Sequence, residues 1–388
     1  MNIKRIVLSM GLGVTLALTA GSIDVLAQNF NPILTGVPSI NITPDARAAG
    51  LGDQGTSTSP DEYSQYWNAS KYAFMDSKAS FNFSYTPWLS KLVNDIALYE
   101  IGGHYKIGTK DNQAISASLR FFDMGKVDQW DDMGQSLGVA HPNEMAIDFA
   151  YSRKLSPYFS MALGMRYIHS NQDLKEGNGS GHAFAMDISG FFNKTYSIFH
   201  KDVVWSAGFN VKNIGTKVNY GDSGPNNNFI PSNLGIGTGI SIAFDQMNTL
   251  AIHTEFNKLL VPTPPLYDPK DVDKDKKREN YFNTSSIGGI FKSFGDAPKG
   301  FAEEMKEISW SIGTEYGFNN QFFGRAGYHF MHPDKGNLQF MTLGAGFKHK
   351  VFRVDVSYLI STVQSNPLDQ TFRLTVGLNI PELKNLFR

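Results

Sequence analysis

The sequence predicts an all-β protein, a transmembrane antiparallel β-barrel of about fourteen strands. Two observations carry this prediction. From Ala79 onward, apolar and polar residues alternate in runs of about ten residues, the length of a tilted strand that crosses a membrane. The connections between the runs are alternately short and long, as in outer-membrane barrels. We expect a signal peptide at residues 1–27, a segment without alternation at 28–78, and the barrel at 79–388.

The composition excludes several classes of protein. Charged residues make up 18% of the 388 residues and the net charge is -1, so no basic surface indicates nucleic acid as a partner. The chain has no cysteine, which excludes disulfides, thiolate metal sites, iron–sulfur clusters and cysteine nucleophiles. Beyond residue 28 no apolar run is long enough for a membrane-spanning helix.

The N-terminus has the features of a secretory signal peptide. Lys4 and Arg5 precede an apolar run at 6–20, and small residues at Val25 and Ala27 form a cleavage site before Gln28. The alternative is a membrane anchor, but the run is shorter than the ~20 residues that span a bilayer. We therefore expect export and a mature chain that begins at Gln28.

Residues 352–360 illustrate the alternation. Phe352, Val354 and Val356 lie on one face of the expected strand, while Arg353 and Asp355 lie on the other. Residues 308–316 and 372–380 repeat the pattern. Further runs centre on Phe83, Ile101, Leu119, Phe149, Leu163, Ile188, Ala207, Ile240, Ile252, Tyr328 and Leu343.

A membrane barrel should carry its polar face inward, whereas a soluble β-sandwich would carry its apolar face inward. Aromatic residues at the strand ends favour the barrel, because they form girdles at the membrane interfaces. These residues are Tyr85, Tyr105, Tyr151, Tyr167, Trp205, Trp310 and Tyr316. The expected inward charges have both signs and can pair; they are Glu100, Arg120, Asp148, Arg166, Asp187, Glu255, Glu315, Arg325, Arg353, Asp355 and Arg373.

The connection lengths predict the orientation in the cell outer membrane. Short connections such as 108–113 and 245–248 are typical of periplasmic turns, and long ones such as 123–143 and 258–306 of extracellular loops. With an even number of strands, we expect both termini on the periplasmic side.

The segment 28–78 carries a sequence resemblance. Its motif combines Arg47-Ala48-Ala49-Gly50, Gly52, Asp61 and Trp67-Asn68-Ala69-Ser70. This resembles the N-terminal region of the long-chain fatty-acid transporter (FadL-like) superfamily, except that the family's Asn-Pro-Ala has lost its proline here. The resemblance implies a plug inside the barrel, with Arg47, Gly50, Gly52, Asp61, Trp67 and Asn68 as its motif residues. The glycines of 50–55 also fit a dinucleotide-binding pattern, but no strand precedes them, so we interpret them as turn residues.

The long connection 259–306 carries a second resemblance. Ile287, Ile290, Phe291 and Phe294 are spaced to form one face of a short helix. Residues 293–307 resemble the signature loop of the PorV family, FadL-like outer-membrane proteins of the type IX secretion system. The resemblance implies a protein that is not an enzyme. It would bind the C-terminal signal domains of secreted cargo and shuttle them from the outer-membrane translocon to a sortase-like complex that attaches them to lipopolysaccharide.

We expect the partner-binding residues to be Phe291, Phe294, Asp296, Phe301 and Trp130. Lys292, Lys299, Glu303 and Glu304 should form the rim of this apolar face. The alternative is that the apolar residues fold back and cap the barrel mouth.

Two other functions stay open: a FadL-like transporter of hydrophobic solutes and a lipid-A deacylase. A continuous apolar tunnel would favour the transporter, and the inward charges argue against one. The deacylase would need a serine beside one of two His–acid pairs, Glu100 with His104 or His253 with Glu255, and no spacing indicates one. Asp271, Asp273 and Asp275 lack the glycine and glutamate of a calcium loop. We expect no catalytic residue, metal or cofactor.

Overall fold

The computed structural model describes residues 30–172, 179–220, 228–266, 272–364, 366 and 368–386. The chain separates into two units, residues 1–30 and 31–388, and the second contains the barrel. The predicted signal peptide and its cleavage site lie outside the described residues, as does Asp271.

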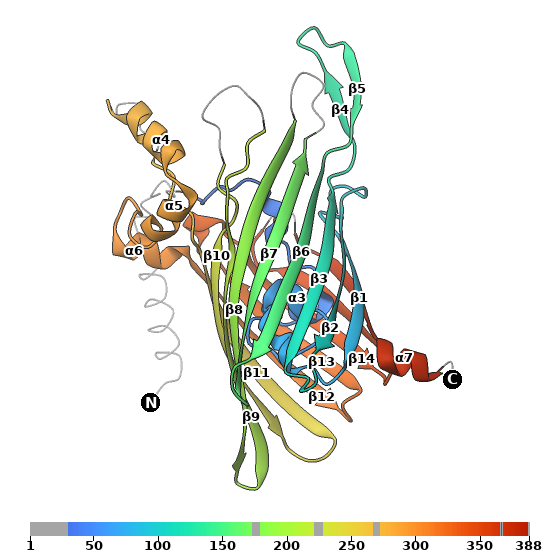
Figure 1. The fold of residues 1–388 in the computed structure, drawn as a ribbon. Coiled ribbons are helices and arrows are strands. Elements are labelled where there is room, and N and C mark those ends of the chain that lie inside the picture. The colour runs from blue at the N-terminus through green and yellow to red at the C-terminus, as the bar shows by residue number, and fades with distance from the viewer. Residues whose placement is uncertain are drawn as a thin grey trace, which may run out of the picture. The chain divides into compact units, whose positions relative to one another are not determined.

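Within the described residues, fourteen antiparallel strands form one closed barrel (Figure 1). Neighbours in the chain are neighbours in the barrel, except that β3 pairs with β6, and β1 closes the barrel against β16. The strands are β1 Ala79–Pro87, β2 Ala97–Ile107, β3 Gln113–Asp123, β6 Asn143–Lys154, β7 Phe159–Asn171, β8 Ser180–Ile198, β9 Lys201–Gly215, β10 Asn233–Ala243, β11 Asn248–Leu259, β12 Ile308–Phe318, β13 Phe322–Phe330, β14 Gln339–Lys348, β15 Phe352–Ser361 and β16 Phe372–Asn379.

The predicted strands and their facing are confirmed. Every run predicted from the alternation is a barrel strand, and the polar side of each strand is the buried side. In β15, Arg353 and Asp355 are buried, while Phe352 and Tyr358 on the opposite face are exposed. No helix among the described residues is both long and apolar enough to cross a membrane.

We expect the closed barrel to resist detergent until it is heated. Closure pairs the backbone of every strand with two neighbours, so partial unfolding must break a ladder such as β1–β16. Unboiled protein should therefore migrate differently from boiled protein in gel electrophoresis. Equal migration of the two samples, together with a helical circular dichroism spectrum, would contradict the barrel.

The two ends of the barrel differ in their connections. Short turns such as 108–112, 199–200 and 349–351 join strands at one end, and loops of eight or more residues join them at the other. We call these the short-turn end and the long-loop end. The strand β1 begins and β16 ends at the short-turn end, where α7 Ile380–Leu386 follows β16.

The longest loops contain their own secondary structure. The β3–β6 loop folds as a hairpin of β4 Val127–Trp130 and β5 Ser136–Ala140. The β11–β12 loop contains α4, α5, α6 and η3, and Figure 1 shows its helices at the long-loop end of the barrel. The bounds are α4 Lys274–Asn283, α5 Ser286–Lys292, α6 Phe301–Glu304, η3 Met305–Glu307 and, in the β13–β14 loop, η4 Pro333–Lys335.

Residues 37–75, which we call the inner segment, are mostly buried inside the barrel (Figure 1). They form η1 Pro38–Asn41, α2 Ala46–Ala49, α3 Ser64–Trp67 and η2 Ala69–Phe74. The helix α2 contacts β14, β15 and β16, whereas η2 contacts β3, β6, β7 and β8, so the segment spans the lumen between opposite walls.

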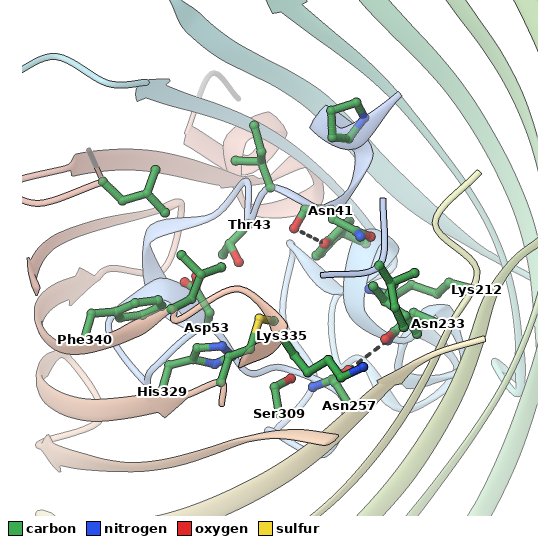
Figure 2. A pocket seen from close by; sticks show the side chains of 18 of the residues that line it. Asn41, Thr43, Asp53, Lys212, Asn233, Asn257, Ser309, His329, Lys335 and Phe340 are labelled. Atoms are coloured by element: carbon green, nitrogen blue, oxygen red, sulfur yellow. Dashed lines mark hydrogen bonds between the residues drawn. The ribbon is translucent and has the colours of Figure 1, made fainter. Parts of the chain in front are cut away.

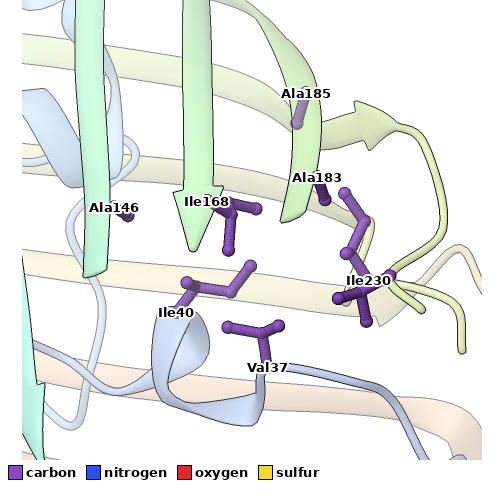
Figure 3. Packing of buried hydrophobic residues seen from close by; sticks show 8 residues of the cluster. Val37, Ile40, Ala146, Ile168, Ala183, Ala185 and Ile230 are labelled. Carbon is purple, nitrogen blue, oxygen red and sulfur yellow. The ribbon is translucent and has the colours of Figure 1, made fainter. Parts of the chain in front are cut away.

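Apolar contacts hold the inner segment in place near both ends of the barrel. Near the long-loop end, Val37 and Ile40 pack on Ile168 and on small residues of β6 and β8 (Figure 3). Toward the short-turn end, Tyr72 and Met75 of the η2 region pack on alanines of β3, β6 and β7. The segment therefore runs from the long-loop end to the short-turn end.

The predicted side of the N-terminus needs a correction, whereas α7, near the C-terminus, lies at the short-turn end. The backbone N–H of Asn31 donates to Asp334 in the β13–β14 loop, and its side chain donates to Pro264 in the β11–β12 loop. Asn31 thus lies at the long-loop end, opposite to the start of β1. An even strand number determines where β1 begins and β16 ends, but not the route of the chain before β1, which here passes through the lumen.

Candidate functional site

Arg47 is the centre of a buried ion-pair network in the lumen. Its Nε and Nη2 bind the two carboxylate oxygens of Glu315 at 3.1 and 2.9 Å, and its Nη1 lies 2.5 Å from Asp61 Oδ2. Ser59 accepts two further hydrogen bonds from the same guanidinium. The Arg47 and Asp61 of the predicted plug motif are therefore direct partners, and Glu315 of β12 connects them to the barrel wall.

The other motif residues join the inner segment to itself and to β8 and β9. Trp67 Nε1 donates to Asp45 Oδ1 at 2.6 Å, and Asp45 also accepts the Ala48 N–H at the start of α2. Asn68 Nδ2 donates to the carbonyl groups of Thr56 and Gly190, the latter on β8. Asn210 of β9 donates to the Trp67 carbonyl.

Two motif glycines allow close backbone approaches. Gly52 has φ +83°, and a Cβ there would lie 2.8 Å from the Tyr328 carbonyl oxygen of β13. A Cβ on Gly50 would lie 3.0 Å from the Cα of Gly344 on β14. Both positions need glycine because the inner segment touches the barrel backbone there.

Ion pairs continue around the wall of the lumen. Arg120 pairs with Glu100 at 2.7 Å, and Arg166 pairs with Asp148 and Asp187. On the opposite wall, Arg325 and Arg353 converge on the fully buried Asp355, and Arg325 also binds Glu315. The predicted inward charges are thus confirmed as inward, and most of them are paired across neighbouring strands.

A cavity of about 320 Å³ remains between the inner segment and the long-loop end of the barrel (Figure 2). We call it the mouth cavity. Its wall combines apolar loop residues with polar groups from the inner segment, from strands β9 to β13 and from β16. Asp53, Lys212, Ser309 and Arg373 belong to this wall. The alternation predicted Arg373 as inward but missed Lys212, which the same pattern in β9 could have revealed.

A buried charge cluster anchors the helices of the β11–β12 loop. Lys258 of β11 binds Glu304 at 3.0 Å and Glu307 at 2.8 Å, and Lys335 of η4 binds Glu303 and Glu307. Burial opposes ionisation of Glu307, but hydrogen bonds from the two lysines and Thr263 lower its pKa overall. Burial also disfavours the charge on Lys335, and its hydrogen bonds to the glutamates nevertheless raise its pKa. Both directions favour the charged forms of Glu307 and Lys335 at neutral pH.

The predicted rim of the apolar face is wrong for two of its members. Glu303 and Glu304 do not lie at an exposed edge; both are buried and point into the root of the loop. The sequence placed them beside exposed lysines, but the lysines that pair with them come from β11 and from the β13–β14 loop.

The expected partner-binding phenylalanines are exposed. The exposed fractions are 76% for Phe291, 55% for Phe294 and 79% for Phe301, and Ile287 is 64% exposed on the same helix as Phe291. We call these four residues the α5–α6 face. The helix α5 forms where the sequence predicted it, with the Ser285 side chain accepting the Gly288 N–H at its start. Its Gly289 packs against Phe229 and Pro262, which leaves the phenylalanines outward.

The remaining two expected residues lie elsewhere. Asp296 is half-buried and accepts the Thr263 N–H at 3.2 Å, and burial raises its pKa. Trp130 is 62% exposed at the end of β4. It belongs to the loop between β3 and β6, six strands away from β11–β12 around the barrel, so the structure does not bring it to the α5–α6 face.

Two Ser–His pairs occur in the barrel interior. Ser80 Oγ lies 2.6 Å from His104 Nδ1, and Ser311 Oγ lies 2.9 Å from His329 Nδ1. The other ring nitrogen of His104 contacts the Ser77 carbonyl, and among the described residues neither histidine hydrogen-bonds a carboxylate. Both serines are buried, and the part of the chain that the structure describes has no cluster of His, Asp and Glu that could hold a metal.

Comparison with protein families identifies the chain. The model of the type IX secretion system protein PorV matches residues 25–266, well over half of the sequence. The chain belongs to the PorV family. The matched part contains the inner segment, strands β1 to β11 and the β4–β5 hairpin. It ends before α4, so the PorV match does not include the α5–α6 face.

Solved structures similar to this PorV-family chain include two toluene transporters and a FadL homologue. The toluene transporter TodX of Pseudomonas putida has 11% identity and a TM-score of 0.46, with 85% of this chain and 96% of TodX covered. The toluene transporter TbuX of Ralstonia pickettii has 11% identity and a TM-score of 0.44, with 88% and 97% covered. A Pseudomonas aeruginosa FadL homologue has 9% identity and a TM-score of 0.40, with 90% and 99% covered. No curated protein matches the chain significantly.

Proposed function

We propose that the protein is an outer-membrane component of the type IX secretion system that binds the C-terminal signal domains of cargo proteins. It would carry cargo from the translocon to a sortase-like complex that attaches it to lipopolysaccharide. The observation that carries the proposal is membership of the PorV family, whose model covers most of the barrel. In the outer membrane, the short turns would face the periplasm and the long loops would meet partners outside the cell.

The α5–α6 face supports a protein-binding role. Its four apolar side chains are exposed, while the loop that carries them is fixed at its root by Lys258, Glu307 and Lys335. A fixed loop loses little conformational entropy when it binds a partner. Large exposed apolar side chains close in the chain to Lys292 and Lys299 are typical of a protein interface.

The lumen supports a role for the inner segment as a plug. Arg47 connects this segment to Glu315 on the wall, and further paired charges line the lumen around it. Buried ion pairs are unfavourable surroundings for an apolar molecule. The plug therefore favours a binding protein over a channel for hydrophobic solutes.

The test of the proposed function is recovery of cargo with the barrel. A tagged barrel purified from its own outer membrane should carry secreted proteins with C-terminal signal domains, and removal of those domains from one cargo should abolish its recovery. A barrel that recovers no such cargo, in cells that export it normally, would contradict the proposal.

Changing Phe291 and Phe294 together to Ser should weaken partner binding by roughly tenfold or more, because exposed aromatic anchors carry much of the energy of an interface. Recovery of cargo or translocon per folded barrel would be measured. The matched control is Leu92→Ser with Val93→Ser, an exposed apolar pair in the β1–β2 loop that should leave binding unchanged.

The cap hypothesis gives a different outcome for the same variant. If the phenylalanines stabilise the barrel mouth, heat stability should fall and binding per folded barrel should stay constant. Normal stability together with normal cargo export and attachment would remove the α5–α6 face from the binding site.

One observation favours a second candidate, a transporter of hydrophobic solutes: apolar loop residues line the mouth cavity, among them Trp88, Leu338 and Leu368. Uptake of an apolar solute into vesicles that contain the barrel, faster than into empty vesicles, would favour this candidate.

A further inference from the structure

A groove lies on the outside of the barrel, close to the long-loop end. Its floor is a row of aromatic side chains on three neighbouring strands: Phe256 of β11 pairs with Trp310 of β12, which pairs with Phe330 of β13. The rings of Trp310 and Phe330 stack with their centres 5.5 Å apart. Ser309 and Ser311, on either side of Trp310 in the chain, are buried on the inward face, so the row faces away from the lumen. We call this feature the outer groove.

The outer groove lies at the depth where lipid headgroups meet acyl chains. Aromatic residues at the strand ends of a membrane barrel mark this boundary. Met305 and Lys306 of η3 line the groove on the side of the β11–β12 loop, His332 lines it from the β13–β14 loop, and Ile308 lines it at the start of β12. Its volume is about 310 Å³, and its floor continues the outward face of the strands, which contacts lipid in a membrane barrel. An acyl chain therefore fits the floor of the groove.

The rim of the outer groove carries cations around a single carboxylate. Lys306 Nζ binds Asp334 Oδ2 at 2.8 Å, which uses one of the three donors of the ammonium. This hydrogen bond lowers the pKa of Asp334, and the charges of His332 and Lys299 act in the same direction, so Lys299 also lies near this carboxylate. Asp334 is thus shared by two lysines. The glutamates of the same loop are buried at its root in the charge cluster described above.

His332 presents a further donor at the rim. Its Nδ1 accepts the Asp334 N–H at 3.1 Å, so the proton of the neutral ring is on Nε2. Among the described residues, Nε2 has no hydrogen-bond partner, and the side chain is 31% exposed. The rim therefore offers N–H donors from Lys306 and His332, with Lys299 close by, directly above an apolar floor.

We propose that the outer groove binds one molecule of lipid A, the phosphorylated lipid part of lipopolysaccharide. An acyl chain would lie over the aromatic row, and a phosphate monoester would accept hydrogen bonds from Lys306, Lys299 and the Nε2–H of His332. A phosphate monoester has about two negative charges and three acceptor oxygens, so it matches two lysines better than a phosphodiester with a single charge.

The position of the groove favours lipid A over other lipids with the same group. Lipid A carries phosphate monoesters and lies in the outer leaflet of the outer membrane, which the long-loop end would meet in the proposed orientation. The inference rests on that part of the proposed function and is independent of cargo binding. A barrel that recovers no cargo would leave it standing.

Trp310 reports on the lipid in the groove, because bromine atoms on an acyl chain quench a tryptophan that they touch. The full-length barrel would be placed in phosphatidylcholine vesicles that also contain phosphatidic acid, phosphatidylglycerol or phosphatidylcholine with brominated chains. The share of Trp310 in the quenching is the difference between the wild type and Trp310→Phe. Phosphatidic acid, a phosphate monoester, should occupy the groove about threefold or more in preference to phosphatidylcholine, and phosphatidylglycerol should show a smaller preference.

A displacement experiment identifies the source of the phosphate. Lipid A without bromine, added to vesicles that contain brominated phosphatidic acid, should restore the fluorescence of Trp310. Lipid A whose phosphates have been removed with a phosphatase should restore much less of it, because the charged hydrogen bonds at the rim are lost.

Three variants assign the site. Lys306→Gln together with Lys299→Gln should remove the preference for phosphatidic acid, while quenching by phosphatidylcholine persists. Lys126→Gln, which changes an exposed lysine of the β3–β6 loop, is the matched control and should leave the preference unchanged. Ile308→Phe should reduce quenching of Trp310 by every brominated lipid, because the larger side chain fills the groove. The Ile308 variant also tests the site if the double lysine variant does not fold.

Four results would overturn the proposal. They are equal quenching of Trp310 by the three brominated lipids, an equal preference for phosphatidylglycerol and phosphatidic acid, restoration of fluorescence that does not depend on the phosphates of lipid A, and quenching that is unchanged in both the double lysine variant and Ile308→Phe.

Discussion

Arg47→Leu is expected to lower the free energy of unfolding by about 3–5 kcal/mol, the effect of removing one partner from a buried ion pair. The substitution removes a bidentate bond to Glu315 and the 2.5 Å contact with Asp61. Glu315 keeps Arg325 as a partner at 2.6 Å, but Asp61 loses the only arginine that binds it directly among the described residues. The measurement is urea unfolding of the barrel in lipid vesicles, followed by tryptophan fluorescence.

A surface ion pair provides the control for Arg47. Lys91 binds Asp369 at 2.9 Å, but the Lys91 side chain is 48% exposed, so Lys91→Ala should change the unfolding free energy by only about 0–1 kcal/mol. Adding Asp61→Asn to Arg47→Leu should restore part of the loss, because it removes the unpaired charge. An Arg47→Leu barrel as stable as the wild type would show that the network does not hold the inner segment in place.

Leu374→Arg is expected to destabilise the barrel by about 2–4 kcal/mol, the effect of an arginine that faces lipid near the middle of the membrane. Leu374 lies on the outward face of β16 and pairs with Val356, the fifth of the ten residues of β15. Its central position means that the guanidinium cannot reach the interface easily.

The same substitution near the strand end is the matched control. Leu378 has the same facing on β16 but pairs with Phe352, the first residue of β15 at the short-turn end. Leu378→Arg should therefore change the unfolding free energy by only about 0–1 kcal/mol. Equal effects at the two positions would contradict the assigned depth, and an unchanged Leu374→Arg barrel would contradict the assigned facing.

The sequence predicted the barrel well because alternation is a local property. Each strand shows its own facing through the period of two, so Arg353 and Phe352 can be assigned to opposite sides without knowledge of any other strand. The helix α5 is equally local, since its spacing and its Ser285 cap lie within one short segment. Elements inside the loops were harder to predict from the sequence. The β4–β5 hairpin and α4 carry little apolar periodicity and were not predicted.

The sequence alone thus determined that the protein is a β-barrel with an inward polar face, because facing follows from neighbouring residues in the chain. Only the tertiary structure decided which charges are partners. Arg47 binds Glu315, which lies 268 positions away in the sequence. Glu303 points inward because it binds Lys335, which belongs to another loop. The same holds for Arg373, whose alternation predicts an inward charge like that of Arg353, but whose nearest carboxylate, Asp53 at 3.6 Å, becomes apparent only in the closed barrel. Pairing depends on distances between segments that are remote in the chain, and no local pattern encodes those distances.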